Sequence, residues 1–283
     1  MRRVSETKEH ARALAYVGVM VAVLAPLLLW ASPGCSASRE EGIVGKEVQY
    51  THNEATMKGY LAYNASSDAK RPGILVVHEW WGHNEYARQR ARQLAEVGYI
   101  ALAVDMYGEG KQANHPEDAG KFASQVMSNM EAMKGRMLAA KQYLMSAALC
   151  DSTKIAAIGY CFGGGVVLHA ARMGMDLDGV VSFHGSLGTA SPAQSGTVVA
   201  KVLVLNGADD PFVTKEQIEM FKQEMDGAGV DYTFINYPGA VHAFTNPGAD
   251  SLGARFNLPL AYNKSADEAS WEEMMSFLRK IFQ

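Results

Sequence analysis

A cysteine set between glycines is the first feature of the sequence that could carry out chemistry. Cys161 lies in the run Gly-Tyr-Cys-Phe-Gly at 159–163, directly after the apolar stretch 155–159 and before a segment of helical character. A buried strand that turns sharply into a helix exposes the side chain at the turn, and flanking glycines avoid Cβ clashes there. The helix N-terminus also carries partial positive charge, which favours a thiolate. This pattern predicts a nucleophile, against the alternative of a buried structural cysteine.

Two later residues are candidate partners for this thiol. Asp210 follows the apolar strand 201–205, and His242 follows the strand Tyr232–Tyr237. Taken singly, an aspartate after a strand is common in turns and a histidine is often incidental. The order nucleophile, acid, histidine, with each residue just beyond a strand, is however that of hydrolases built on a parallel sheet. We therefore expect His242 to act as the base and Asp210 to orient it.

A fourth polar residue follows the strand 73–77. Glu79 is in His-Glu-Trp-Trp-Gly at 78–82, where such hydrolases place one backbone N–H of the oxyanion hole. We assign that donor to Trp80 and the second donor to Phe162, the residue after the nucleophile. His78 is interpreted as a structural neighbour of Glu79.

At these positions the sequence resembles the dienelactone hydrolase family over residues 45 to 282. The resemblance is carried by Glu79, by Gly-Tyr-Cys161-Phe-Gly-Gly, by Gly207-x-x-Asp210-x-x-Val213 and by His242-x-Phe244. The spacing of the third motif selects Asp210 over Asp209 as the acid. The resemblance implies an α/β-hydrolase fold without a large lid and a Cys-His-Asp triad that acts through an acyl-enzyme. It also implies that Glu79 accepts the thiol proton until substrate binds.

Two positions depart from the family pattern. The dienelactone enzymes hold the substrate carboxylate with two arginines, and this chain has Gly108-Glu109-Gly110 and Asn246 at the corresponding places. Glu109 facing the cleft would repel a carboxylate, and Asn246 lacks the charged fork that binds one. If both residues face the cleft, neutral esters or lactones should be preferred over anionic ones, unless Lys111 supplies the missing charge.

Other residues near these motifs are candidates for the pocket wall: Trp81, Tyr107, His184, Phe244 and Asn246. His184 precedes the acid in the chain, so a structural or hydrogen-bonding role is favoured over a catalytic one. No His, Cys, Asp or Glu cluster has metal-ligand spacing and no glycine-rich loop resembles a phosphate cradle, so neither a metal nor a cofactor is expected.

The elements that must position these residues alternate along the chain. An opening hairpin at 48–63 precedes strands at 73–77, 99–104, 155–158, 179–183, 201–205 and 232–237. Helices are expected at 85–96, over a long Met- and Ala-rich region at 116–149, from 163, and at 214–225 and 266–281. This alternation predicts an α/β fold with a mostly parallel central sheet and helices on both faces. Ligands bind such sheets at the carboxyl ends of the strands.

The N-terminus predicts export. Basic residues up to Arg12 precede an uncharged run from Ala13 to Ala31 and then a small-residue stretch that contains Cys35. We expect residues 1–37 to be an export signal or membrane anchor, 38–45 a linker and 46–283 the hydrolase domain. A cleaved signal, a lipoprotein signal at Cys35 and an uncleaved anchor remain open. The predicted location is periplasmic or membrane-anchored, with membrane contact only through this segment.

Composition excludes other classes of protein. The net charge of −4 over 283 residues leaves no basic surface for nucleic acid. Cys150 and Cys161 flank an apolar strand, which at about 3.3 Å per residue holds them beyond the roughly 7 Å that a disulfide spans. We therefore expect two free thiols. The motifs above predict a hydrolase for a small ester or lactone, and the oligomeric state stays open, with a monomer expected. The alternatives are a binding protein on an inactive hydrolase fold and a redox-active thiol protein.

Overall fold

The computed structural model describes residues 42–283. The predicted export segment 1–37 lies outside the described residues, as does most of the predicted linker. Strand β1 begins at Ile43, so the sheet starts within the stretch predicted as linker. Ile43 pairs with Asn64, which shows that the opening hairpin is longer than the sequence pattern indicated.

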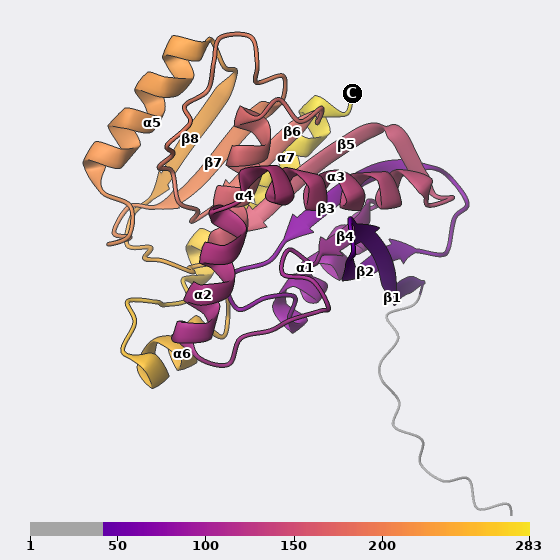
Figure 1. Ribbon diagram of the computed structural model, residues 1–283, viewed down its shortest axis with the longest axis horizontal. Coiled ribbons are helices and arrows are strands. Elements are labelled where there is room, and N and C mark those ends of the chain that lie inside the picture. The colour runs from indigo at the N-terminus through magenta and orange to yellow at the C-terminus, as the bar shows by residue number, and fades with distance from the viewer. Residues whose placement is uncertain (1–41) are drawn as a thin grey trace, which may run out of the picture. The chain divides into compact units, whose positions relative to one another are not determined.

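The described strands form one sheet in the order β1-β2-β4-β3-β5-β6-β7-β8 (Figure 1). β1 pairs with β2 and β2 with β4 in antiparallel fashion, and all other neighbours are parallel. The strands are β1 (Ile43–His52), β2 (Ala55–Asn64), β3 (Arg71–Val77), β4 (Ile100–Val104), β5 (Cys150–Tyr160), β6 (Gly179–Phe183), β7 (Lys201–Gly207) and β8 (Tyr232–Tyr237). The predicted mostly parallel α/β sheet is confirmed.

Helices cover both faces of this sheet. They are α1 (Glu85–Glu96), α2 (Pro116–Met127), α3 (Met130–Ser146), α4 (Phe162–Arg172), α5 (Lys215–Ala228), α6 (Ala249–Phe256) and α7 (Lys264–Ile281). Apolar residues of α3, α4 and α5 pack on one face, and those of α1 and α7 pack on the other.

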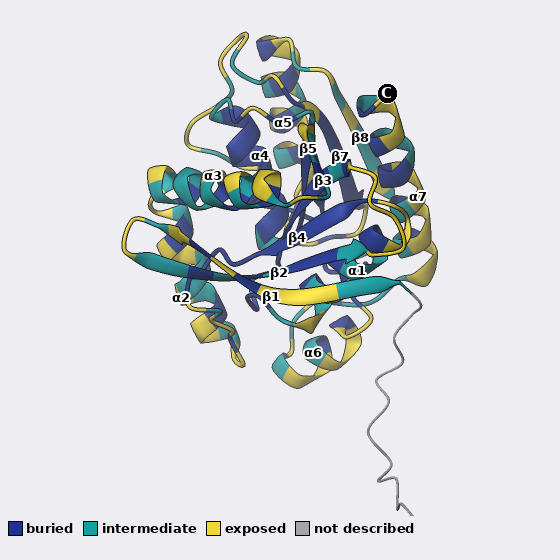
Figure 2. Cartoon of the chain, turned by 90° about the vertical axis from the view of Figure 1, so that its right-hand side faces the viewer, coloured by how far each residue is buried: buried dark blue, intermediate teal, exposed yellow. Residues whose placement is uncertain are grey.

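Alternation along the strands explains the two cores. In β3, Leu75 and Val77 join the core under α3 and α4, whereas Ile74 and Val76 join the core under α1 and α7. Successive side chains of a strand point to opposite faces, so a strand covered on both sides must be apolar throughout. The central strands are accordingly buried, whereas β1 is partly exposed (Figure 2).

The helical region predicted at 116–149 is two helices. The chain turns at Ser128 and Asn129, and the Asn129 side chain caps α3 by accepting the Ala132 N–H at 3.0 Å. Asparagine is favoured at helix N-caps, so Asn129 was the sequence signal for the start of a second helix. The continuous helical pattern of the region obscured this signal. Helix α6, between β8 and α7, was not predicted; it is short, and Asn257 ends it in the left-handed conformation.

Both cysteines of the described region are free, as the sequence predicted. Cys150 begins β5 and is buried, whereas Cys161 follows the end of the same strand and is partly exposed. None of the helices in residues 42–283 combines the length and apolar character needed to cross a bilayer.

Candidate active site

Cys161 stands at a strained turn between β5 and α4. Its φ of 53° and ψ of −114° lie outside the helical and extended regions, and it is the N-cap residue of α4. A Cβ on Gly159 would lie 2.0 Å from the Gly163 carbonyl oxygen, and one on Gly163 would lie 2.3 Å from that of Val77. Only glycine fits at these two places, because real Cβ contacts are never so close. The tight packing of β5, α4 and β3 therefore presents the thiol at the carboxyl edge of the sheet.

One line of contacts joins the three residues that the sequence grouped together. His242 Nε2 lies 3.1 Å from Cys161 Sγ, and His242 Nδ1 lies 2.8 Å from Asp210 Oδ2. The carboxylate of Asp210 is fully buried, whereas Asp209 is exposed and does not reach the imidazole. The geometry therefore agrees with the choice of Asp210.

The environment of His242 favours its charged form. Burial by itself would lower the pKa of this imidazole. The negative charge of Cys161 and the hydrogen bonds to Asp210 and Cys161 outweigh burial and raise the pKa to about 10. His242 is thus an imidazolium at neutral pH, with Nδ1–H facing the Asp210 carboxylate and Nε2–H facing the Cys161 sulfur.

An aromatic residue that the sequence reasoning missed covers this imidazole. The Phe212 ring lies edge-on to His242 with centroids 5.0 Å apart, and about half of the side chain is exposed. Its N–H donates to Asp210 Oδ1 at 2.8 Å. Phe212 lies two residues beyond the acid, so its position next to a predicted catalytic residue was the available signal.

Glu79 is buried close to the same site but does not contact the thiol in the described structure. Its Oε2 accepts a hydrogen bond of 2.6 Å from Asn246 Nδ2. Asn246 Oδ1 accepts the Gly248 N–H, which establishes that the amide nitrogen faces Glu79. Burial raises the pKa of Glu79 to about 7, although the Asn246 hydrogen bond opposes the shift. A carboxyl group of this pKa can take up or release a proton near neutral pH.

The two predicted oxyanion donors are the backbone N–H groups of Trp80, in the loop after β3, and of Phe162, at the start of α4. Phe162 is the first residue of α4, so its N–H has no partner within the helix. The carbonyl of Glu79 belongs to the same peptide as the Trp80 N–H, and it binds His78 Nδ1 and the Gly82 N–H. A trans peptide points its N–H away from its carbonyl, so these contacts fix the direction of the Trp80 N–H. His78 thus has the structural role that the sequence suggested.

The sequence model of the dienelactone hydrolase family matches residues 57–282. The chain belongs to the dienelactone hydrolase family. Membership indicates a hydrolase that acts on esters or lactones, on an α/β-hydrolase fold.

Individual relatives agree with this assignment to the dienelactone hydrolase family. A dienelactone hydrolase-like promiscuous phosphotriesterase from metagenomic libraries has a solved structure with TM-score 0.79 and 33% identity, covering 85% of this chain and 99% of that one. A putative carboxymethylenebutenolidase from Saccharolobus solfataricus is 26% identical over 83% of this chain and 98% of its own length. The protein usf of Aquifex pyrophilus is 25% identical over 84% and 99%, respectively.

Glu109 and Asn246, the two departures from the dienelactone hydrolase pattern, were considered above as residues that face the cleft. Their contacts in the structure are as follows. Glu109 is exposed and forms an ion pair with Lys58 at 3.1 Å, so its charge is offset at the surface. Asn246 is buried and binds Glu79. The expectation that Glu109 repels anionic substrates in the cleft is therefore not supported by its geometry.

Two of the pocket-wall candidates, Phe244 and Trp81, are packing residues. Phe244 is fully buried and packs on His184 and Tyr237, so it belongs to the core beneath the site. Trp81 is almost fully buried and packs on Trp80 and on Phe256 of α6. Trp80 is partly exposed, as are Tyr237 and Phe256.

Tyr107 and His184 make specific polar contacts. The Tyr107 hydroxyl donates to the Trp80 carbonyl at 2.9 Å, and its ring packs on Phe162. His184 is fully buried and accepts the Cys161 N–H at 3.1 Å. No group of His, Cys, Asp or Glu within residues 42–283 is arranged to hold a metal ion.

Proposed function

We propose that this member of the dienelactone hydrolase family cleaves small esters or lactones with Cys161 as nucleophile, His242 as acid and base, and Asp210 as the orienting carboxylate. The observation that carries the proposal is the continuous line from Asp210 through His242 to Cys161, with contacts of 2.8 Å and 3.1 Å. The nucleophile in this line, Cys161, is at a strained turn, where the carbonyl carbon of a substrate can approach its sulfur.

Acylation begins with the Cys161 thiolate beside the His242 imidazolium. The sulfur attacks the carbonyl carbon, and the carbonyl oxygen becomes an oxyanion between the N–H groups of Trp80 and Phe162. Each donor of this kind typically stabilises the transition state by about 3–4 kcal/mol. His242 then gives its Nε2 proton to the departing alkoxide as the tetrahedral intermediate collapses to a thioester. In a lactone the released alcohol stays attached to the acyl group.

Deacylation uses the same residues in reverse. His242, now neutral, takes a proton from water, and the resulting hydroxide attacks the thioester. The oxyanion forms again between the same two N–H groups, and Cys161 leaves as a thiolate next to the imidazolium. Asp210 keeps the Nδ1–H of His242 directed at itself in both halves of the cycle.

We assign Glu79 the role of thiol-proton acceptor in the resting enzyme, as the family resemblance implied. Its raised pKa near 7 supports the assignment, because the group can hold a proton at neutral pH. When the sulfur pairs with His242 and the proton passes to Nε2 of the imidazole, Asn246 stabilises the carboxylate that remains on Glu79. The ionised carboxylate is therefore not left without a partner in the buried site.

The matched pair of cysteines tests the nucleophile. Cys161→Ala should abolish hydrolysis of p-nitrophenyl acetate and leave the circular dichroism spectrum intact. Cys150→Ala should keep turnover, because Cys150 is buried in β5 and burial raises its pKa to about 11. The wild-type protein should also show a thioester mass increment on Cys161 when quenched early. Equal losses of activity in both variants would exclude the assignment.

The same assay separates the two alternatives. A binding protein on an inactive hydrolase fold would show no turnover with any ester or lactone. A redox-active thiol protein would lose its Cys161 thiol to peroxide without showing esterase activity. A panel of neutral and anionic esters and lactones would narrow the substrate class. It should include a phosphotriester, because the metagenomic relative is described as a promiscuous phosphotriesterase.

We also propose that the enzyme is exported, on the basis of the basic and apolar pattern of residues 1–37. Fractionation of cells that produce the full chain tests this: the protein should be found in the periplasmic or membrane fraction. Mass spectrometry of its N-terminus would distinguish a cleaved signal from lipidation at Cys35 or a retained anchor. The monomeric state stays a prediction.

A further inference from the structure

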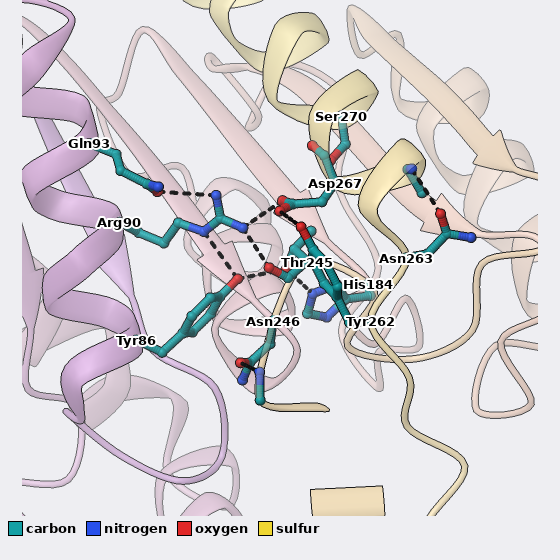
Figure 3. A network of polar contacts seen from close by, with 12 residues as sticks. Tyr86, Arg90, Gln93, His184, Thr245, Asn246, Tyr262, Asn263, Asp267 and Ser270 are labelled. Carbon is teal, nitrogen blue, oxygen red and sulfur yellow. Dashed lines mark hydrogen bonds and ion pairs between the residues drawn. The ribbon is translucent and has the colours of Figure 1, made fainter. Parts of the chain in front are cut away.

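A buried polar network reaches the back of the proposed site through one threonine. Thr245, three residues after His242, is fully buried. Its hydroxyl oxygen lies 2.7 Å from His184 Nε2 and 2.7 Å from the Tyr86 hydroxyl, and its carbonyl accepts from Arg90 at 2.6 Å (Figure 3). His184 in turn contacts the N–H of Cys161. Thr245 therefore connects the nucleophile's backbone with α1.

The contacts of His184 define which of its nitrogens carries the proton. Nδ1 faces the Cys161 N–H at 3.1 Å, so Nδ1 must be the unprotonated acceptor. A neutral imidazole then carries its proton on Nε2, which donates to Thr245 Oγ1. The opposite tautomer would set two N–H groups against each other and leave Thr245 without this donor. The Cys161 N–H thus requires the Nε2–H tautomer, and the Thr245 hydroxyl is the acceptor that pairs with its buried Nε2–H.

His184 must also stay uncharged for the site to work. Its ring lies edge-on to His242 with centroids 5.4 Å apart, and Arg90 adds another positive charge behind it. Burial, His242 and Arg90 together place the pKa of His184 well below its ordinary value. A neutral His184 leaves the His242 imidazolium free of repulsion from this side.

Arg90 makes the placement of Thr245 rigid. It is buried, pairs with Asp267 of α7 at 2.5 Å and donates from Nε to the Tyr86 hydroxyl at 3.2 Å. The guanidinium therefore ties α1 to α7 and to both the carbonyl and, through Tyr86, the hydroxyl of Thr245 (Figure 3). Planar, forked donors such as guanidinium suit a site that must hold several acceptors in one geometry.

We propose that Thr245, held by Arg90 and Tyr86, is a positioning residue that keeps His184 in its Nε2–H tautomer and so holds the Cys161 backbone at the strained turn. The Cys161 N–H is shared between His184 Nδ1 at 3.1 Å and the Phe183 carbonyl at 3.0 Å. This shared donor anchors a residue whose φ is 53°, a conformation that costs free energy and persists only when neighbours enforce it. The inference rests on the proposed nucleophilic role of Cys161.

The test compares Thr245→Val with Thr245→Ser. Valine keeps the shape but removes the hydroxyl, leaving His184 with a buried, unpaired N–H; serine keeps the hydroxyl. We expect kcat for p-nitrophenyl acetate to fall about tenfold or more in Thr245→Val with KM nearly unchanged. Thr245→Ser should retain kcat within about threefold. Equal kcat values in the two variants would overturn the proposal, whether both are active or both impaired.

Thr245→Ala, which also lacks the hydroxyl, serves if the valine variant does not fold. The stability control is Asn129→Ala, which removes the N-cap hydrogen bond of α3. Asn129 makes none of the contacts described for the site. The substitution should lower the melting temperature without a change in kcat. A fall in kcat that simply follows melting temperature across all variants would argue against a positioning role.

Nitrogen NMR of histidine-labelled protein gives a readout independent of turnover. In the wild type and Thr245→Ser, the signal assigned to His184 by its loss in His184→Gln should show a protonated Nε2 and an unprotonated Nδ1. In Thr245→Val and Thr245→Ala it should show a mixture of tautomers. An unchanged tautomer in those variants would overturn the proposal. An inactive wild type with the expected tautomer shift would instead exclude the hydrolytic function of Cys161 and leave the link between Thr245 and His184 supported.

Discussion

Three buried histidines at the site carry different charges because their ring nitrogens face different groups. His242 meets a carboxylate and a sulfur, and its pKa rises to about 10 despite burial. His78 and His184 each accept a backbone N–H with one nitrogen, and burial lowers the pKa of both. Identical side chains thus become one imidazolium and two neutral imidazoles within one small region. For the latter two, desolvation is the largest cause and outweighs the backbone hydrogen bonds that would raise the pKa.

Glu79→Gln should stabilise the protein at neutral pH and lower its activity. Burial raises the pKa of Glu79 from 4.5 to about 7, so folding takes up a proton between these two values. Stability therefore falls as pH rises through that window, and the whole cost is present above it. At about 1.4 kcal/mol per unit, the cost is about 3 kcal/mol. Glutamine avoids this cost and can still accept from Asn246.

Urea unfolding at two pH values measures this effect. The variant should exceed the wild type by about 3 kcal/mol near pH 8 and by little near pH 4. Its kcat/KM should be lower, and a change of activity with pH near 7 in the wild type should be absent from the variant. A variant that is less stable than the wild type at both pH values would show that Glu79 is held as a well-stabilised carboxylate instead.

The neighbouring aspartates give a second contrast at the residue scale. Asp210→Asn should lower kcat by roughly a thousandfold, because an amide can stabilise the wrong tautomer of His242 and no longer balances the imidazolium. Asp209→Asn should change kcat by less than about twofold, because that side chain is exposed and its residue contributes only its backbone N–H to the Ala240 carbonyl. Steady-state kinetics with one ester measure both. A larger loss in Asp209→Asn would exchange their roles.

At the scale of elements, the site is assembled from loops that follow parallel strands. Glu79 follows β3, Cys161 follows β5, His184 follows β6, Asp210 follows β7 and His242 follows β8. Carboxyl ends of parallel strands lie along one edge, so residues distant in sequence meet there. In the loop after β4, Glu109 lies away from this group of residues. Its N–H donates to the Thr56 carbonyl of β2, which holds Glu109 next to the antiparallel strands.

This placement predicts that Glu109 has little influence on substrate charge. Glu109→Gln should change the ratio of kcat/KM between a neutral and an anionic ester by less than about twofold, because an exposed ion pair contributes at most about 1 kcal/mol and its field is screened. The measurement uses two esters that differ only by one carboxylate, at low and high salt. A gain of several-fold for the anionic ester would mean that Glu109 does face the bound substrate. The preference for neutral substrates itself stays a prediction.

At the scale of the whole molecule, the sheet carries helices on both faces, and α6 packs on loops outside these two layers. Residues Arg39–Gln283 form one compact unit that contains every residue of the proposed site. We therefore expect a chain that starts at Arg39 to fold in one cooperative transition and to keep kcat/KM within about twofold of the full chain. Thermal unfolding and p-nitrophenyl acetate kinetics check this. A loss of activity without a loss of folding would assign a role in the reaction to the first 38 residues.

Local patterns were enough to predict the alternation of strands and helices and the turn at Cys161. Continuous apolar runs bounded by glycine identify buried strands, and α1, β6 and β8 have the predicted bounds. The order of Cys161, Asp210 and His242 along the chain, together with the position of each after a strand, also predicted their convergence. These features depend on residues close in sequence and on the general geometry of parallel sheets, which leaves few alternatives.

Long-range packing decided what those patterns could not. Whether Asn246 faces substrate or Glu79, whether Glu109 lines the cleft or pairs with Lys58, and which nitrogen of His184 is protonated all depend on partners far away in the chain. The contact between Arg90 and Thr245 spans 155 positions, and nothing local to either residue signals it. A buried polar side chain takes the charge state and direction in which hydrogen bonds from its neighbours offset the free-energy cost of its desolvation. Those neighbours come together only when the chain folds.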